Sequence, residues 1–505
     1  MENQNFEYGT NVRLRYSIII NFSARALSMF VNLIFILCVV RKLSIIEFGI
    51  WTMMIRYIGY VMPFVAIYSY WLPRTIARGI NTAKTGLLLA FLLGLTSSLI
   101  YAFFIMGVSE LFKQPLIPLL LAVLIVFQDY LNRGLIGISV SHSPQYVGIA
   151  NLAMRIVQTI LGVLLLVFYR LGLYGAVLAM VLGRTASTIL LFSLNLKIIR
   201  DSELDIKFVK IWFKRSWLPL YNQLLIALLG LDVIIVRWVT SSEEPIAYFG
   251  VAIYIVGLTL ATTQTLPALY ARLLSRRDTR DITEAFWLVF MLSIPLSVGI
   301  IIYTEPILAI YNIRYMIIAS AVRIFAIVAI LRLLNVILRT TLRGLEIKDH
   351  IDLNTSLGLK ETVLFKIPNT EFLVNGLYFI LLGMIAYIFS YDYITIVLLW
   401  GIMRLLRLSM LILIFHHFIR KEFNISLPYR TFLKYIGKFI VASIPMILVR
   451  MLLPIPLYAR IYQQVISFLP AILISGVLYF IVLYAIDPKM RDFVRRIIIY
   501  IRQQA

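Results

Sequence analysis

The sequence predicts an all-α membrane protein that crosses the bilayer about fourteen times. Of its 505 residues, 61% are hydrophobic and 14% are charged, whereas a soluble globular protein is nearer half apolar and a quarter charged. Apolar stretches of about 20 residues, long enough to cross the hydrocarbon core, recur along the whole chain. The single cysteine, Cys38, excludes an internal disulfide.

The predicted spans fall into two groups of six, followed by two more. They begin near Tyr16, Ile46, Thr85, Leu116, Tyr146, Leu173, Trp217, Ile246, Ala285, Met316, Leu373, Tyr393, Ile436 and Val465. A short internal repeat, Arg41 to Trp51 and Arg237 to Tyr254, marks an outer turn in each group. Two halves in the same orientation are related by a pseudo-two-fold axis along the membrane normal, with a binding site between them.

These spans define four segments of the chain. Residues 1–200 form an N-terminal lobe, and 201–216 form an amphipathic linker on the cytoplasmic membrane surface. Residues 217–430 form a second lobe, whose polar cytoplasmic insert at 346–371 is expected to be a solvated loop. Residues 431–505 hold the last two helices and a basic tail.

Lysine and arginine are divided unequally between the two sides of the membrane. With alternating spans, 31 of the 47 lie on the side of the N-terminus and 6 on the opposite side. Such an excess marks the cytoplasmic side, so we expect both termini in the cytoplasm and the protein in the plasma membrane. The net charge of +23 is therefore a topology signal, and no nucleic-acid partner is expected.

The remaining ten arginines lie inside predicted spans, where only Asp129 and Asp232 are acidic. At most two of them can therefore have an intramembrane carboxylate partner. A charge at that depth is expensive unless it faces a wet cavity. Arg237 and Arg450 lie near outer span ends and are expected to snorkel. The ten are Arg25, Arg56, Arg155, Arg184, Arg237, Arg323, Arg332, Arg404, Arg407 and Arg450.

Polar residues follow one helix face in the first and fifth spans, because residues three and four apart are neighbours. The first stripe is Ser17, Asn21, Arg25, Ser28 and Asn32, and the second is Asn151, Arg155, Gln158 and Gly162. Arg184 joins them from the sixth span, and Asp129 is expected to pair with one arginine. Polar contact between helices is the alternative interpretation. Several arginines favour a cavity.

Sequence motifs for catalysis are absent. There is no Gly-x4-Gly-Lys-Ser/Thr phosphate loop, no Cys/His set for zinc and no Gly-x-Ser-x-Gly elbow. The outward loops carry no carboxylate cluster. We therefore expect neither an enzyme nor a bound cofactor.

The segment from Leu33 to Trp51 resembles the loop after the first helix in polysaccharide-biosynthesis flippases of the multidrug/oligosaccharidyl-lipid/polysaccharide exporter (MOP) superfamily, which include O-antigen flippases. In that family Arg-x-Leu is followed by Glu-Phe/Tyr-Gly-x-Trp/Tyr. Residues 41–48 are expected to form a turn, with Gly49 opening the next helix. The insert at 346–371 departs from the family's compact connection. The matching residues are Arg41, Leu43, Glu47, Phe48, Gly49 and Trp51, then Trp217–Leu220, Asp232, Tyr248–Ala252 and Leu342–Lys348.

The resemblance implies two six-helix lobes around a V-shaped cavity, two further helices, and alternating access. The implied substrate is an oligosaccharide linked to polyprenyl or dolichyl (pyro)phosphate, moved from the inner to the outer leaflet. A net-positive membrane interior independently suits phosphate, which arginine binds in a bidentate way. We expect a monomer among membrane lipids, near glycosyltransferases or an oligosaccharide transferase, and coupled to a Na⁺ or H⁺ gradient or the membrane potential.

The predicted substrate site combines the phosphate-holding arginines with neighbouring polar residues. Arg56 is placed toward the outer exit and Arg332 toward the cytoplasmic entrance. Asp129 and Asp232 are expected to bind a coupling ion or to pair with arginine. The full set that lines the cavity is Arg25, Arg155, Arg184, Arg56, Arg332, Asn21, Asn32 and Asn151.

Two other functions remain open on the sequence. One is an ion-coupled small-molecule antiporter of the MATE type, although those proteins carry an acid in the first helix where this chain has Arg25. The other is a non-transporting scaffold of a glycan-synthesis complex. A scaffold gains nothing from several intramembrane arginines, so the flippase is favoured.

Overall fold

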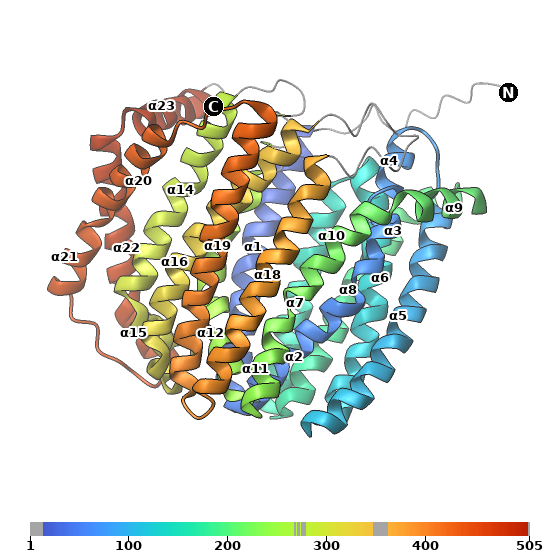
Figure 1. The fold of residues 1–505 in the computed structure, drawn as a ribbon, viewed down its shortest axis with the longest axis horizontal. Coiled ribbons are helices and arrows are strands. Elements are labelled where there is room, and N and C mark those ends of the chain that lie inside the picture. Colours follow the sequence, from blue (N-terminus) through green and yellow to red (C-terminus); the bar gives the residue numbers. More distant parts are fainter. Residues whose placement is uncertain (1–13, 267–268, 270–272, 274–278, 347–361, 503–505) are drawn as a thin grey trace. The chain divides into compact units, whose positions relative to one another are not determined.

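The computed structural model describes residues 14–266, 269, 273, 279–346 and 362–502. Every regular element in these ranges is helical (Figure 1). Within these ranges, thirteen helices are long and apolar enough to cross a membrane, and the count is fourteen if the bent pair Ile45–Val61 and Pro63–Ala77 is one span. The prediction of an all-α polytopic membrane protein with about fourteen spans is confirmed.

The chain divides into two compact units, residues 1–247 and 248–505. In unit 1, α1 and α8 pack on α7, α6 packs on α5 and α8, and α10 packs on α2. The seventh predicted span therefore belongs to unit 1, while the predicted lobe limits stay predictions. The elements are α1 (Leu14–Lys42), α2 (Ile45–Val61), η1 (Pro63–Val65), α3 (Ala66–Ser69), α4 (Leu72–Ala77), α5 (Ala83–Phe112), α6 (Leu116–His142), α7 (Gln145–Val163), η2 (Leu164–Phe168), α8 (Gly172–Arg200), α9 (Ile206–Arg215), α10 (Trp217–Leu228) and α11 (Leu231–Thr240), with the start of α12 (Glu244–Leu260).

Unit 2 holds most of α12 and the remaining helices. The helix α16 packs on α14, α18 and α19, while α20 packs on α14 and α22. A continuous core of buried apolar side chains, including Trp287, Phe290 and Leu411, joins these helices. The elements are η3 (Ala261–Thr265), α14 (Thr279–Ile302), α15 (Thr304–Tyr311), η4 (Ile313–Ile318), α16 (Ala319–Leu345), α18 (Val363–Ile388), α19 (Tyr393–Phe423), α20 (Tyr429–Ser443), α21 (Pro445–Leu452), α22 (Ile461–Ile486) and α23 (Pro488–Arg502).

The turn after the first span is shorter than predicted. The helix α1 continues to Lys42 and α2 begins at Ile45, so Arg41 and Phe48 are both helical. A capping box explains the early start. The Ser44 hydroxyl accepts from Glu47 N at 3.1 Å, and the Glu47 carboxylate accepts from Ser44 N at 2.9 Å. Two otherwise unsatisfied amides are thereby satisfied, and the helix can begin there.

The eleventh span starts ten residues earlier than predicted. The helix α18 begins at Val363, so residues 363–371 of the predicted solvated insert are its first turns. Residues 347–361 of that insert lie outside the described part of the chain. Glu371 is 7% exposed and pairs with Arg339 of the neighbouring helix α16 at 3.1 Å. Glu346 is 5% exposed and accepts from Val363 N at 2.9 Å.

Three spans are broken near their middles or ends. Pro63 begins a new helical segment in the second span, and Pro445 begins one in the thirteenth, because proline cannot donate the backbone hydrogen bond that would continue the helix. In the seventh span α10 ends at Leu228 and α11 begins at Leu231. The break occurs at Gly230.

The predicted linker forms the short helix α9. The Asp205 carboxylate caps it by accepting from Lys207 N at 2.9 Å. Trp212 is 1% exposed, while Ile206 and Phe213 are exposed among the lysines. The prediction of an amphipathic segment is confirmed at the level of the helix, and its location on a membrane surface stays a prediction.

Candidate functional site

The polar face of α7 is the centre of the site in unit 1. Arg155 is half-buried and donates from Nη1 to the amide oxygen of Gln158 at 3.0 Å. Gln158 is only 2% exposed. One turn earlier, Asn151 is half-buried on the same face. The bond between Arg155 and Gln158 orients a guanidinium that keeps its positive charge.

A polar ladder joins α6 to α8. Arg184 Nε donates to Asp129 Oδ1 at 2.6 Å, and the two side chains are 19% and 24% exposed. On either side Gln128 donates to the Thr185 hydroxyl at 2.7 Å, and Asn132 to the Thr188 hydroxyl at 3.3 Å. The prediction that Asp129 pairs with an arginine is confirmed. The pairing limits the electrostatic cost of an arginine at this depth.

The packing register brings Arg25 to the same depth as these groups. The Thr159 hydroxyl of α7 donates to Val31 O of α1 at 3.0 Å. The helices α1 and α7 run in the same direction. Arg155 therefore lies level with residue 27 of α1, about 3 Å along the helix axis from Arg25. On the other side, a Cβ on Gly183 of α8 would lie 2.8 Å from Gln158 Cβ. Close packing therefore aligns the arginines of all three helices.

We call Arg25, Arg155, Arg184 and Asp129 the arginine belt. Arg25 is exposed and Arg155 and Arg184 are half-buried, so the three guanidinium groups are not sealed in the protein interior. Three positive charges against one negative charge leave the belt with a net charge of +2. A site of this kind can bind an anion through planar, permanently charged forks.

The other residues predicted to line the cavity have different surroundings from the belt. Asn32 is half-buried on α1, and the side chain of Asn21 lies outside the described part of the structure. Arg332 is exposed on α16 in unit 2. Whether these residues line one cavity with the belt stays a prediction.

A second polar cluster surrounds the break in the seventh span. Asp232, in the first turn of α11, is 0% exposed. Arg56 is half-buried on α2, and Tyr60 lies one turn further along the same face. A Cβ on Gly230 would lie 3.2 Å from the Tyr60 hydroxyl, so glycine permits the close approach of α2 to the break. A buried carboxylate at this point can hold a proton or a cation.

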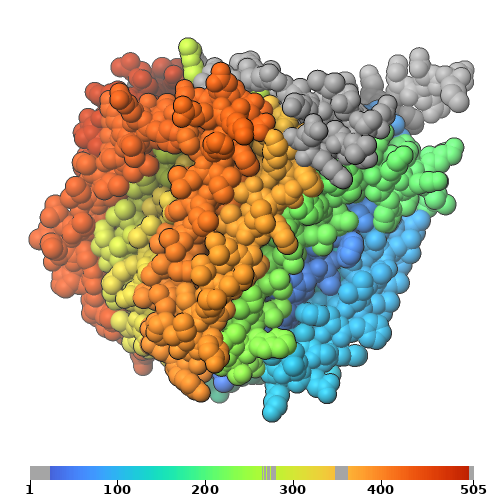
Figure 2. Space-filling model, in the orientation of Figure 1, coloured from blue at the N-terminus to red at the C-terminus, as the bar shows by residue number. Residues whose placement is uncertain are grey.

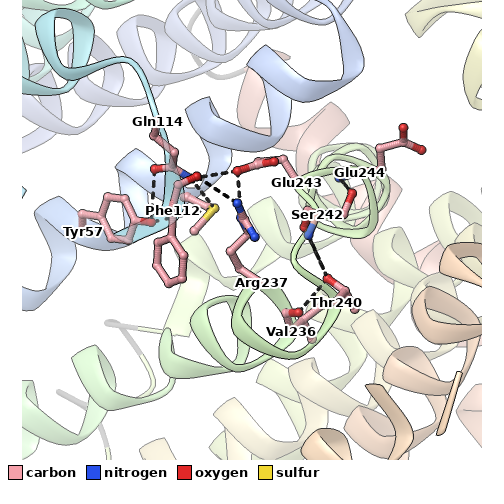
Figure 3. A network of polar contacts seen from close by, with 10 residues as sticks. Tyr57, Phe112, Gln114, Val236, Arg237, Thr240, Ser242, Glu243 and Glu244 are labelled. Atoms are coloured by element: carbon pink, nitrogen blue, oxygen red, sulfur yellow. Dashed lines mark hydrogen bonds and ion pairs between the residues drawn. The ribbon is translucent and has the colours of Figure 1, made fainter. Parts of the chain in front are cut away.

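A third polar network lies at the end of unit 1 that the charge asymmetry predicts to be the outer one (Figure 3). Arg237 is 8% exposed, donates from Nε to Glu243 Oε1 at 2.7 Å, and donates from Nη2 to Phe112 O at 2.9 Å. Gln114 Nε2 donates to the same Glu243 oxygen at 3.2 Å. We call this the outer network. Arg237 is thus buried and paired, and the prediction that it snorkels is wrong.

The motif that carried the family resemblance is part of this outer end. Glu47 Oε1 accepts from Leu173 N at 3.3 Å, which holds the start of α8 against α2. A Cβ on Gly49 would lie 2.4 Å from Glu243 O. Trp51 is 1% exposed and packs on Phe35 with the ring centroids 6.0 Å apart. The motif residues therefore hold neighbouring helices together, and none of them belongs to the arginine belt.

Sequence reasoning missed Gln114 and Glu243, the two neighbours that make Arg237 structural. Both lie in turns between spans, where helical periodicity gives no signal about contacts. Among the described residues, no group of three or more His, Cys, Asp or Glu side chains could hold a metal ion.

Comparison with known proteins identifies the fold of this chain but matches it to no family model. No family model matches the sequence, and no curated protein matches it. Solved structures do match, at 14–16% identity. A lipid II flippase, MurJ, in an inward closed conformation has a TM-score of 0.64 and 15% identity, and covers 95% of this chain and 99% of its own.

Two other structures match a shorter part of the chain. An inward-facing multidrug resistance transporter of the MATE family, in the MOP superfamily, has a TM-score of 0.60 and 14% identity, with 81% of this chain and 99% of its own covered. A MOP superfamily transporter from Pyrococcus furiosus, described as having a binding pocket of reverse polarity, has a TM-score of 0.51 and 16% identity, with 81% and 95% covered. The chain has the fold of MOP-superfamily transporters, as the resemblance predicted.

Proposed function

We propose that this protein is a transporter that flips a lipid-(pyro)phosphate-linked oligosaccharide from the cytoplasmic to the outer leaflet by alternating access. The single observation that carries the proposal is the arginine belt. Four helices bring three arginines and one aspartate to one depth inside apolar spans. Such a charge excess within a membrane calls for an anionic partner. A phosphate or pyrophosphate accepts several charge-assisted hydrogen bonds at once.

The fold comparison supports the lipid-linked substrate. The structure that covers 95% of this chain is that of a lipid II flippase. In our proposal the phosphate group binds the belt, the glycan passes through the cavity and the lipid tail stays in the bilayer. We place both termini in the cytoplasm because of the charge asymmetry of the loops, and the protein in the plasma membrane.

An antiporter of the MATE type is the second candidate. The buried Asp232 favours it, because a fully buried carboxylate can exchange a proton or Na⁺ with the two sides of the membrane. The position of Arg25 in the first span disfavours a cationic substrate. In a flippase the same Asp232 can couple transport to a Na⁺ or H⁺ gradient.

Transport in reconstituted vesicles tests the proposal. Purified protein is placed in vesicles with a labelled lipid-linked oligosaccharide, and only an ion gradient or a membrane potential is applied. We expect flipping without ATP, a loss of about tenfold or more for Arg25→Ala and Arg155→Ala, and a partial loss for Arg25→Lys, which keeps the charge without the planar fork.

The matched control is Arg460→Ala, because Arg460 is exposed in the connection before α22. Its rate should equal that of the unaltered protein. Normal flipping by both belt variants, or strict dependence on added ATP, contradicts the proposal. Uptake of a cationic dye with no flipping identifies the antiporter instead.

A further inference from the structure

Three helices of unit 2 turn polar faces toward one another. On α18 the face is Glu371, Asn375 and Tyr378, and on α19 it is Trp400, Arg404 and Arg407. On α16 it is Arg332, Asn335 and Arg339. Each set follows a spacing of three or four residues, which keeps it on one helix face. All three helices pack on one another.

The opposite faces of α18 and α19 are apolar and uncovered. Leu373, Ile380 and Leu413 are 72%, 59% and 67% exposed. Figure 2 shows long uncovered sides of these helices, in orange, on the face in view. The polar faces are thus distinct from the surface that suits lipid tails.

Contacts between α18 and α19 fix two of the arginines. Arg407 Nη1 donates to Asn375 Oδ1 at 3.1 Å. Arg404 Nε donates to the Tyr378 hydroxyl at 3.4 Å, and its guanidinium lies 4.6 Å from the centroid of the Phe249 ring. An aromatic ring beneath a guanidinium restricts its orientation and leaves its edge to form hydrogen bonds.

The stack beneath Arg404 is itself held in place. Phe249 stacks on Trp400 with the ring centroids 4.1 Å apart and an interplanar angle of 4°. Trp400 Nε1 donates to the Tyr378 hydroxyl at 2.8 Å. A rigid support of this kind reduces the conformational entropy that Arg404 loses when a ligand binds.

The register brings the arginines of α16 beside those of α19. A Cβ on Gly401 would lie 2.9 Å from Ile324 Cγ2. The two helices run in the same direction, so Arg407 lies within about 3 Å, along the axis, of Arg332. Asn335 and Arg339 continue this face by one and two turns. We call Arg332, Arg339, Arg404 and Arg407 the basic ladder.

Arginines outnumber carboxylates in the described lengths of the three helices. Glu371 pairs with Arg339 at 3.1 Å. In the described lengths of α16, α18 and α19, the other carboxylate is Glu422, which pairs with Lys366 at 2.6 Å. The ladder and Glu371 together carry a net charge of +3 within apolar spans. A counter-charge at this position lowers the electrostatic cost.

Asn335 supplies an independent sign of a missing acceptor. Its side chain is 7% exposed, and its Nδ2 has no hydrogen-bond partner in the part of the chain that the structure describes. Buried polar groups are normally paired. The arginines around it are donors only, so none of them can accept from this amide. An anion beside Arg332 and Arg407 can accept from it.

We propose that the basic ladder binds a phosphate-type oxyanion, distinct from the one bound by the arginine belt of unit 1. Such an anion offers several acceptor oxygens to two or more guanidinium forks and to Asn335 at once. The anion site follows from the geometry of unit 2, while its assignment to a phosphate of a membrane lipid rests on the proposed function.

Binding of pure probes tests this inference without transport. The full-length Arg25→Ala/Arg155→Ala protein is used, so that the belt does not contribute. Three probes are compared by calorimetry and native mass spectrometry: inorganic pyrophosphate, polyprenyl pyrophosphate without glycan, and phosphatidylglycerol. We expect at least one to bind, and Arg404→Gln/Arg407→Gln to weaken that binding about tenfold or more. Arg460→Gln is the surface control and should bind as before.

Asn335→Leu separates a ligand contact from a structural role. It removes an unsatisfied buried amide, so the melting temperature of the free protein should hold or rise. Binding of the same probe should still weaken about threefold.

Each outcome decides between defined alternatives. Preference for polyprenyl pyrophosphate assigns the site to the substrate, preference for phosphatidylglycerol to the bulk lipid, and preference for pyrophosphate to a soluble anion. Binding of none of them, or binding unaffected by both Arg404→Gln/Arg407→Gln and Asn335→Leu, overturns the proposal. Failure of the belt variants to slow flipping overturns the proposed function alone.

Discussion

Arg237 of the outer network and Arg155 of the arginine belt have opposite surroundings. Arg237 is 8% exposed, bonds to the Glu243 carboxylate and the Phe112 carbonyl, and lies 5.0 Å from the Phe112 ring centroid. Arg155 is half-buried and bonds to a neutral amide of its own helix. The difference teaches that burial and the charge of the partner, rather than the presence of an arginine in a span, separate a structural group from a binding group.

Arg237→Ala should give the largest loss of stability. It leaves the Glu243 carboxylate buried and without its positive partner, which lowers the free energy of unfolding by about 3–5 kcal/mol. Arg155→Ala should change stability by about 1 kcal/mol or less, because its bond to Gln158 is to a neutral amide and half-exposed surroundings can hydrate the gap. Chemical denaturation of the purified proteins measures both. Equal losses would erase the distinction between network and belt.

Gly49→Ala should produce an intermediate loss that is confined to the outer end. The added Cβ would meet Glu243 O at 2.4 Å, and the backbone must shift at a cost of about 1–3 kcal/mol. Gly59→Ala, on the same helix with no atom within 4 Å of the new Cβ, is the matched control and should be neutral or stabilising. If the two alanines behave alike in thermal unfolding, the close contact at Gly49 does not exist.

Ser44→Ala should give the smallest loss. It removes the hydroxyl that accepts from Glu47 N and so weakens the start of α2 by about 1 kcal/mol. Affinity for a phosphate probe at the belt should not change, because the cap lies at the end of the span. Loss of probe affinity with unaltered melting would show that the outer end contributes to binding after all. Ser44→Thr keeps a capping hydroxyl and should restore most of the stability.

Hydrophobic patterning predicted the fold well because each span must satisfy its own backbone within lipid. It missed the first turns of α18, since Lys366, Pro368 and Glu371 look like loop residues on their own. The Arg339 side chain of α16, which pairs with Glu371, makes helical burial possible there. The shortened turn after α1 was missed for a related reason, as the capping box acts through atoms rather than hydropathy.

Helical spacing predicted the belt residues, and the pairing of Asp129 with an arginine, because those depend on position along each span. It could not reveal which arginines are structural. The Arg237 partner, Glu243, follows a turn in which Ser241 adopts a left-handed conformation with φ of 52°. Only that backbone reversal brings the carboxylate back to the guanidinium. The role proposed for Arg404 and Arg407 likewise depends on contacts with α18 side chains, which spacing along one helix does not reveal.

The net charge of the belt has an electrical consequence. One elementary charge that crosses a 100 mV membrane potential does about 2.3 kcal/mol of work. In the proposed flippase, a belt of +2 that shifts through part of that field during a conformational change makes the empty carrier sensitive to voltage. A bound diphosphate of about −2 cancels the moving charge. The conformational change of the loaded protein then involves almost no electrical work. The membrane potential therefore acts mainly on the return step of the empty protein.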